Sequence, residues 1–296
     1  MIPKSFSKHF YMMLIPGLIW LALFNLYPMY GVLTAFKEFN PGLGIWQSPW
    51  VGMENFQYMF ELDDSRIVFR NTVVIAFAKM VGNLIVPFVF ALMLNEVKNR
   101  LLTRTVQTIV YLPHFLSWVI VAGMMLDIFS YSGPVNQVLS SLGLEPIMFF
   151  GNAHIFPALV VGSDVWKEFG FNAIIFFSAL TAINPEMYEA AAVDGASQWK
   201  RLIKITIPSI IPVAALLATL SLGSILNAGF DQIFNMYNPS VYSTGDIVDT
   251  WVYRAGLIDF QYGLATAVGL LKSVVGLVLI TISYTLAYRF ANYRIF

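Results

Sequence analysis

Six long runs of apolar residues set the strongest limit on how this chain can fold. They lie at about 10–33, 68–94, 105–129, 154–182, 208–234 and 262–291. A helix of about 20 apolar residues crosses the hydrocarbon core of a bilayer. The chain is 58% hydrophobic and only 11% charged, whereas soluble domains are about 25% charged. The sequence therefore predicts an all-α membrane protein with six transmembrane helices in one domain, residues 1–296, and excludes an ordinary soluble enzyme.

Basic residues are shared unequally between the two sets of loops that connect these runs. Cytoplasmic loops of membrane proteins carry the excess of Lys and Arg, so the richer set predicts that both termini are cytoplasmic. The predicted inner set is Lys4, Lys8, Lys98, Arg100, Arg104, Lys200, Arg201, Lys204, Arg289 and Arg294, and the outer set is Lys37, Arg66, Arg70 and Arg254.

The formal net charge is zero and cysteine is absent. No nucleic-acid partner is implied, and disulfides and cysteine-based catalytic or metal sites are excluded. The outer segments 35–67, 130–153 and 235–261 are long, and Pro134 can begin a short outer helix. These segments fit two interpretations equally: docking surfaces for an external partner, or caps that close the outer ends of the spans.

The segment 184–208 stands apart from the other loops. Asn184 can cap a helix that begins at Pro185, Gly195 can end it in the left-handed conformation, and Ser197 can cap a second helix. Met187, Ala190, Ala191 and Asp194 would share one face, because they follow i, i+3, i+4, i+7 spacing. This pattern predicts a cytoplasmic helix–turn–helix, either a docking element or a plain connection between two spans.

The string EAAAVDGASQWKRLIKITIPSIIP in this segment resembles the EAA motif of ATP-binding-cassette (ABC) importer permeases. Asp194 and Ala196 stand where the sugar-permease version of this motif, which the segment resembles, has Asp and Ala. Ile207 replaces the leucine that is more common in the family before the proline. Matches elsewhere, such as Tyr111–Trp118, resemble polysaccharide and aldouronate permeases. The matching motif positions are Glu189, Ala190, Ala191, Gly195, Ile205 and Pro208.

This resemblance implies the type I ABC importer permease fold in a bacterial cell membrane. It also implies that Glu189, Ala190, Ala191, Asp194, Gly195 and Pro208 couple the chain to an ATPase. The implied partners are two ATPase subunits that hold ATP and Mg, a second related permease in a heterodimer, and an extracellular or periplasmic solute-binding protein. The chain itself lacks the G-x-x-x-x-G-K-[ST] phosphate loop, so no cofactor, metal or catalytic residue is expected in it.

Polar residues within the predicted spans are candidates for contact with the transported solute, because they are costly in a membrane. Ser224, Asn227 and Asp231 would share one helical face by their spacing, with Gln232 beside them. The fourth span adds Trp166, Glu168 and Asn172. Asparagine and aspartate can bind sugar hydroxyls and tryptophan can stack on a sugar ring, but Asn227 could equally bond a neighbouring helix.

Other polar residues have plainer interpretations. Lys167 can pair with Asp164 or Glu168, and a lone His114 is expected to be packed. Lys79 and Lys272 are expected to snorkel or to pair with a partner permease.

The sequence thus predicts a permease subunit of an ATP-driven importer for oligosaccharides or polysaccharide fragments. An ion-coupled secondary transporter would use Asp127, Asp164 and Lys272 as coupling sites but leaves the segment 184–208 without a purpose. An importer of the same family for another solute, such as a peptide or phosphate, fits Asp194 and Ala196 less well. An intramembrane enzyme lacks a catalytic serine or zinc motif within a span.

Overall fold

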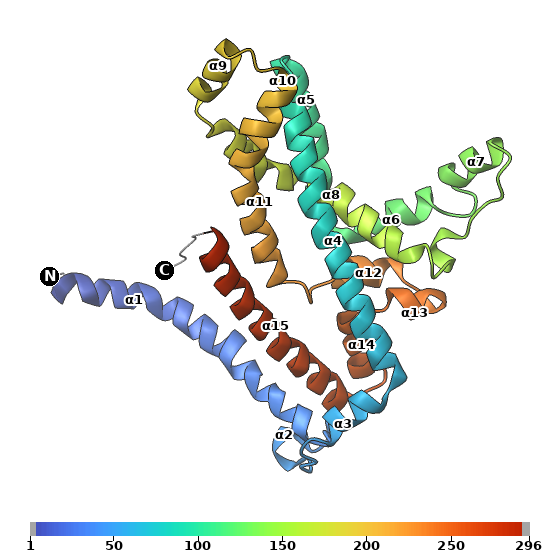
Figure 1. Cartoon of the computed structure of the whole chain (residues 1–296). Helices are drawn as coiled ribbons and strands as arrows, with labels where there is room; N and C mark the ends of the chain where they lie inside the picture. The colour runs from blue at the N-terminus through green and yellow to red at the C-terminus, as the bar shows by residue number, and fades with distance from the viewer. Residues whose placement is uncertain (1–3, 292–296) are drawn as a thin grey trace. The chain divides into compact units, whose positions relative to one another are not determined.

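The computed structural model describes residues 4–291, which form helices joined by loops (Figure 1). Among these residues no strand occurs, and the pairing of Lys37 with Trp50 is an isolated bridge. Arg294, one of the predicted inner basic residues, lies outside the described residues. The α-helices are α1 (Lys4–Leu21), α2 (Gly44–Gln47), α3 (Glu54–Glu61), α4 (Asp63–Asn95), α5 (Arg100–Tyr111), α6 (Trp118–Ile128), α7 (Pro134–Ser141), α8 (Phe156–Thr181), α9 (Pro185–Val193), α10 (Gln198–Arg201), α11 (Ile207–Leu222), α12 (Phe230–Met236), α13 (Tyr242–Gly245), α14 (Val248–Tyr253) and α15 (Tyr262–Ala291).

Short π- and 3₁₀-helical stretches extend several of these helices. Helix α1 continues through a π-helical stretch, Ala22–Leu26, into a 3₁₀ stretch, Tyr27–Phe36. Among the described residues, four continuous helices are long and apolar enough to cross a membrane, or five if a bent pair counts as one span. The four are Phe10–Phe36, Asp63–Asn95, Gln198–Leu222 and Tyr262–Leu286.

Four of the six predicted spans are present as continuous helices near the predicted positions. The second and sixth become α4 and α15, and the first becomes the helical run that ends at Phe36. The fourth corresponds to α8, a helix of 26 residues that carries Asp164, Lys167 and Glu168. Helix α8 is not one of the four continuous helices that are apolar enough to cross a membrane.

The predicted third span, 105–129, is wrong as a single straight helix. The helix Arg100–Phe115 and helix α6 meet at an angle of 104°. Ser117 is extended at ψ 154° and its hydroxyl accepts a hydrogen bond from the N–H of Ile120, so it caps a new helix. Pro113 in the preceding 3₁₀ stretch also lacks an N–H for the α-helical ladder.

The predicted fifth span, 208–234, is wrong at both ends. The helix begins at Gln198, before Pro208, because a π-helical stretch, Leu202–Thr206, joins α10 to α11. It ends at Leu222, and α12 begins only at Phe230 after an irregular segment, 223–229. Gly229 has φ +95°, a conformation that favours glycine and interrupts the helix.

The chain folds into two compact units. Of the described residues, the first unit comprises 4–63 together with 252–271, and the second comprises 64–251 together with 272–291. In the first unit, the small core contains Ala35, Phe56 and Ala267. Its outer loop is organised around Lys37, which is 2% exposed. The ammonium of Lys37 donates hydrogen bonds to the carbonyls of Ile45, Trp46 and Ser48.

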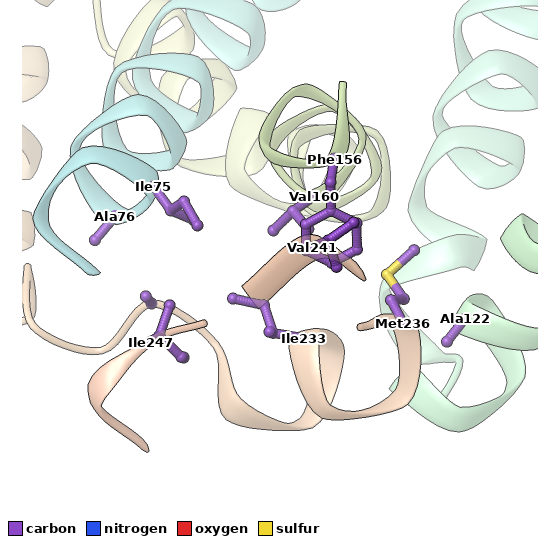
Figure 2. Packing of buried hydrophobic residues seen from close by; sticks show 10 residues of the cluster. Ile75, Ala76, Ala122, Phe156, Val160, Ile233, Met236, Val241 and Ile247 are labelled. Carbon is purple, nitrogen blue, oxygen red and sulfur yellow. The ribbon is translucent and has the colours of Figure 1, made fainter. Parts of the chain in front are cut away.

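The second unit has two hydrophobic clusters along α8. One contains Ile75 and Ala76 of α4, Phe156 and Val160 of α8, and residues of α12 and the segments after it (Figure 2). The other packs Ala91 of α4 and Ile210 of α11 against Ala173, Phe176 and Leu180. Helix α8 contributes residues to both clusters, from its first part to one and from its second part to the other, which makes it the central element of this unit.

Candidate functional site

The segment 184–208 forms the predicted helix–turn–helix. The Asn184 side chain accepts a hydrogen bond from the N–H of Glu186 at the start of α9, and the Ser197 hydroxyl accepts one from the N–H of Lys200 at the start of α10. Gly195 lies between them at φ +74°. The N–H of Ala196 reaches back to the carbonyl of Ala191 at 2.9 Å, which closes the end of α9.

This turn is joined stiffly to the long helix that follows it. Residues Gln198–Leu222 form one continuous helical run of 25 residues. The Tyr188 hydroxyl and the Thr206 hydroxyl lie 2.9 Å apart, so α9 is also fastened to the start of this run. Helix α9 is therefore bonded directly to the helical run that ends at Leu222.

The predicted coupling residues lie where a partner protein can reach them. Glu189, Ala190, Asp194, Gly195 and Pro208 are exposed, and Ala191 is half-buried. Among the side chains that the structure describes, residues 10–286, none pairs with Glu189. The neighbouring cavity of about 320 Å³ is lined by Asn95 and Glu96 together with residues of this segment, so the inner loop predicted after α4 and the helix–turn–helix lie at the same end of the second unit.

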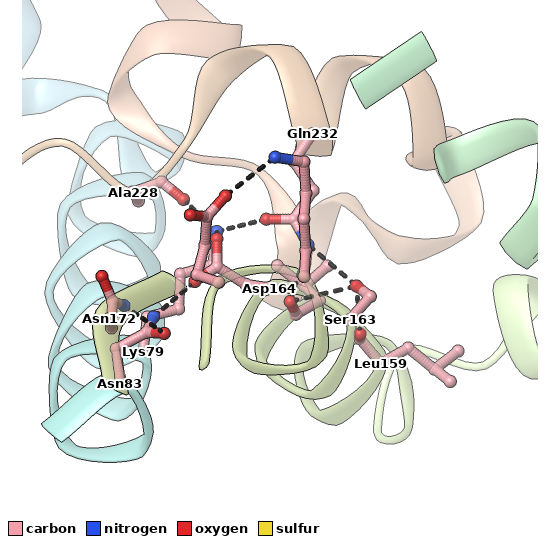
Figure 3. Close-up of polar contacts among 11 residues, drawn as sticks. Lys79, Asn83, Leu159, Ser163, Asp164, Asn172, Ala228 and Gln232 are labelled. Carbon is pink, nitrogen blue, oxygen red and sulfur yellow. Dashed lines mark hydrogen bonds and ion pairs between the residues drawn. The ribbon is translucent and has the colours of Figure 1, made fainter. Parts of the chain in front are cut away.

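A buried polar network ties the irregular segment 223–229 to α4 and α8 (Figure 3). The Lys79 ammonium lies 3.2 Å from a carboxylate oxygen of Asp164. It also donates hydrogen bonds to the Ala228 carbonyl, at 2.7 Å, and to the Gln232 side-chain oxygen. Gln232 is 0% exposed, and its amide nitrogen donates to the Val160 carbonyl and the Ser163 hydroxyl.

The network continues along α4 and α8. The Asn83 amide donates to the second carboxylate oxygen of Asp164 at 2.7 Å, and the Asn172 amide donates to Asn83 at 3.3 Å. The carboxylate is therefore bonded on both oxygens. A charge removed from water is costly unless it is paired and hydrogen-bonded, and both members of this ion pair meet that condition.

The structure separates the residues that the sequence predicted on one helical face. Ser224 and Asn227 lie in the irregular segment and Asp231 lies on α12, so the three share no helix face, and that prediction is wrong. All three are nevertheless exposed, whereas Gln232 is buried in the network. Exposure therefore separates Ser224, Asn227 and Asp231 from the buried Gln232.

On α8 the predicted candidates have different surroundings. Trp166 is 39% exposed and borders a cavity of about 390 Å³ lined mostly by apolar side chains, among them Met124, Phe129 and Phe150. Asn172 is held by Asn83. Trp166 is thus the aromatic side chain of the three, and it is exposed.

Glu168 belongs to a compact ionic cluster. It lies 2.8 Å from the Lys167 ammonium and 2.6 Å from Nδ1 of His114. The His114 ring stacks on Phe171 with centroids 3.9 Å apart, and Lys167 also donates to the His114 carbonyl. The predictions that His114 is packed and that Lys167 pairs with a carboxylate of α8 are confirmed.

Sequence reasoning did not identify how Lys79, Asn83 and Lys272 are used. Lys79 and Lys272 were expected to snorkel or to pair with another chain, but each pairs within this one: Lys79 with Asp164, and Lys272 with Asp249 at 2.5 Å. The i, i+4 spacing of Lys79 and Asn83 within an apolar run could have indicated a shared polar partner, because this spacing places both side chains on one face of a helix. Among residues 4–291, no group of three His, Asp or Glu side chains is placed to hold a metal ion.

Comparisons with known proteins agree with the resemblance seen in the segment 184–208. Residues 83–293 match the family described as "Binding-protein-dependent transport system inner membrane component". Protein LplB of Bacillus subtilis (strain 168) is 40% identical over 291 residues, which cover 98% of this chain and 92% of that protein. The "Polygalacturonan/rhamnogalacturonan transport system permease protein YteP" of the same organism is 37% identical over 98% of this chain and 91% of its own length.

A solved structure extends the agreement to the fold. A chain of a bacterial ABC transporter involved in the import of the acidic polysaccharide alginate superposes with a TM-score of 0.89. The two are 37% identical, and the match covers 97% of each chain. With a family match over most of its length and close relatives along nearly all of it, this chain belongs to the binding-protein-dependent transport system inner membrane components, the permease subunits of ABC importers.

Proposed function

We propose that this chain is the permease subunit of an ATP-driven importer for oligosaccharides or polysaccharide fragments. The observation that carries the proposal is the exposed helix–turn–helix at Gly195, joined to one continuous helix that ends at Leu222. The proposal is supported by the relatives named for polygalacturonan, rhamnogalacturonan and alginate. Saccharide polymers are the substrate class that these names have in common.

The proposed arrangement has six transmembrane spans in one permease domain, with both termini in the cytoplasm and α8 as the fourth span, which carries Asp164, Lys167 and Glu168. An ATPase docks on α9 and the turn after it, through Glu189, Ala190, Ala191, Asp194 and Gly195. The complex contains two such ATPases, which bind ATP and Mg, a second related permease and an external solute-binding protein. The continuous helix from Gln198 carries the motion of the ATPase to the irregular segment 223–229.

In this proposal the solute passes the exposed side chains of Ser224, Asn227 and Asp231, with Trp166 as an aromatic contact. Asn227 and Asp231 supply hydrogen-bonding groups to sugar hydroxyls. Gln232, Glu168 and Asn172 are secondary candidates, because their polar atoms are already bonded within the chain. An ion-coupled mechanism finds less support, since Asp164 and Lys272 are engaged in ion pairs.

Uptake into reconstituted vesicles tests the function. The chain is purified with its membrane partners, and the partners are identified by mass spectrometry. The complex is then reconstituted into liposomes, with ATP supplied on the side of the membrane where the ATPases lie. Labelled oligogalacturonates and alginate oligosaccharides are the probes. We expect ATP-dependent uptake of a saccharide, and uptake driven by a proton or sodium gradient without ATP would contradict the proposal.

Replacing Asn227 or Asp231 by alanine should reduce this uptake per assembled complex. Each loss removes a hydrogen-bonding partner worth about 0.5–1.5 kcal/mol, or more for the charged group, so the half-saturating saccharide concentration should rise about threefold to tenfold. Complex yield and thermal stability are measured on the same preparations, because a residue that only bonds neighbouring helices should lower these quantities first when it is replaced. Unchanged uptake in both exposed variants would exclude this path and leave Trp166 as the better candidate.

The proposed topology predicts which surfaces a membrane-impermeant thiol reagent can reach. Ser132 is exposed beside the predicted outer helix α7, and Val193 is 89% exposed at the end of α9. In intact cells, Ser132→Cys should be labelled and Val193→Cys should be labelled only after permeabilisation. This chain contains no cysteine, so it adds no background. The reverse pattern would overturn both the orientation and the assignment of the ATPase contact.

A further inference from the structure

The irregular segment 223–229 and the start of α12 present buried and exposed residues in alternation. Ala228 and Gln232 are 0% exposed, whereas Asn227 and Asp231, next to them in the chain, are exposed. We call residues 227–232 the corner. The position of its two exposed side chains is therefore set by whatever holds Ala228 and Gln232.

Lys79 holds both of these buried residues. An ammonium group has three N–H donors, and here they meet three acceptors from separate elements: the Asp164 carboxylate of α8, the Ala228 carbonyl and the Gln232 side-chain oxygen of α12. Lys79 itself is 7% exposed and fixed on the long helix α4. The Lys79 ammonium thus bonds the corner to α4 and to the Asp164 carboxylate of α8, while the Gln232 amide makes a second link to α8 through Val160 and Ser163.

The backbone at the corner requires such a partner. Non-helical backbone in a membrane-spanning region is tolerated where protein groups satisfy its polar atoms, and the ammonium satisfies the Ala228 carbonyl. Gly229 follows at φ +95°, and a Cβ atom there would lie 2.8 Å from the Lys79 nitrogen. The positive φ angle of Gly229 and its lack of a side chain therefore both allow the Lys79 ammonium to lie against the corner.

We infer that Lys79 is a positioning residue for solute transport, which orients Asn227 and Asp231 by holding Ala228 and Gln232. Its ion pair with Asp164 provides the fixed point, and Asn83 holds that carboxylate in turn. Lys79 acts through the corner and does not itself meet the solute. This inference rests on the proposed function, because it assigns a role to the corner in the solute path.

Two measurements test the inference on the assembled complex. The first is the labelling rate of Asn227→Cys by a water-soluble maleimide, which reports how the corner is held whatever the complex transports. The second is the half-saturating concentration for oligogalacturonate or alginate oligosaccharide uptake, measured with Asn227 intact. Both are compared in the unaltered chain, in Lys79→Met and in the double variant Lys79→Met/Asp164→Asn. The double variant leaves no unpaired buried charge, so it keeps the test valid if the single variant fails to assemble.

Lys272→Met is the matched control, because it breaks the other lysine–aspartate pair of this unit, with Asp249, away from the corner. We expect several-fold faster labelling in the Lys79 variants and about a tenfold higher half-saturating concentration, the size of effect expected when a charged hydrogen bond is lost. Lys272→Met should match the unaltered chain in both measurements.

Three results would overturn the inference. They are an unchanged labelling rate, faster labelling with an unchanged half-saturating concentration, and a lower complex yield whose surviving complexes transport normally. If the unaltered complex transports no saccharide, the proposed function fails instead, and the labelling rate still shows whether Lys79 holds the corner.

Discussion

Gly195→Trp should abolish saccharide-stimulated ATP hydrolysis by the assembled importer while the chain still inserts into the membrane. No atom lies within 4 Å of the position of a Cβ at Gly195, so the indole would project from the turn onto the face proposed for the ATPase. Loss of a central docking contact typically costs about 2 kcal/mol or more, which corresponds to about a thirtyfold weaker association. Stimulated ATPase activity and co-purification of the ATPase are the measurements.

Gly143→Trp is the matched control for this experiment. Gly143 has φ +77°, also with open space around its Cβ position, and it closes the end of α7 with the same hydrogen-bond pattern, Leu144 N–H to the Leu139 carbonyl. The backbone cost of about 1–2 kcal/mol for a side chain in this conformation is therefore common to both variants. Equal stimulation in Gly195→Trp, Gly143→Trp and the unaltered complex would contradict the proposed coupling site.

Gly170→Ala should strongly destabilise the second unit. A Cβ at Gly170 would lie 2.1 Å from the carbonyl oxygen of Val110, so α8 and α5 must move apart. That oxygen belongs to the backbone and cannot rotate away as a side chain can. Overpacking of this kind costs about 1–3 kcal/mol or more, and we expect lower complex yield together with a lower midpoint in thermal unfolding of the detergent-solubilised protein.

Gly162→Ala, on the same helix, separates this steric effect from any general effect of the substitution. Nothing lies within 4 Å of its Cβ position, and alanine favours a helix interior by about 1 kcal/mol over glycine. Its yield and unfolding midpoint should equal or exceed those of the unaltered chain. A Gly170→Ala protein as stable as Gly162→Ala would show that the close contact between α5 and α8 does not constrain the fold.

The helix–turn–helix at residues 184–208 could be predicted in detail because its determinants are local. Asn184, Gly195 and Ser197 act on backbone groups within a few residues, and each acts as its residue type predicts. Apolar runs likewise located the long helices, because spanning a membrane imposes a minimum length that can be counted along the chain.

The breaks in the third and fifth predicted spans could not be predicted in this way. Apolar residues continue on both sides of each break, so hydropathy joined them into one run, although Pro113, Ser117 and Gly229 are residue types that can interrupt a helix. At residues 223–229 the non-helical backbone is also bonded by an ammonium group that is 149 residues away in sequence, because Lys79 donates a hydrogen bond to the Ala228 carbonyl. The helical spacing assumed for Ser224, Asn227 and Asp231 failed for the same reason.

By itself, the sequence determined that this chain is a helical membrane protein, and it located the docking element that marks its family. Those properties follow from hydropathy, capping and turn residues, whose effects are confined to neighbouring residues. Only the tertiary structure decided which polar residues are bonded within the chain and which are exposed. That division depends on pairs such as Lys79 with Asp164 and Lys272 with Asp249, because a charge in an apolar run must find a partner, and folding alone brings that partner from another helix.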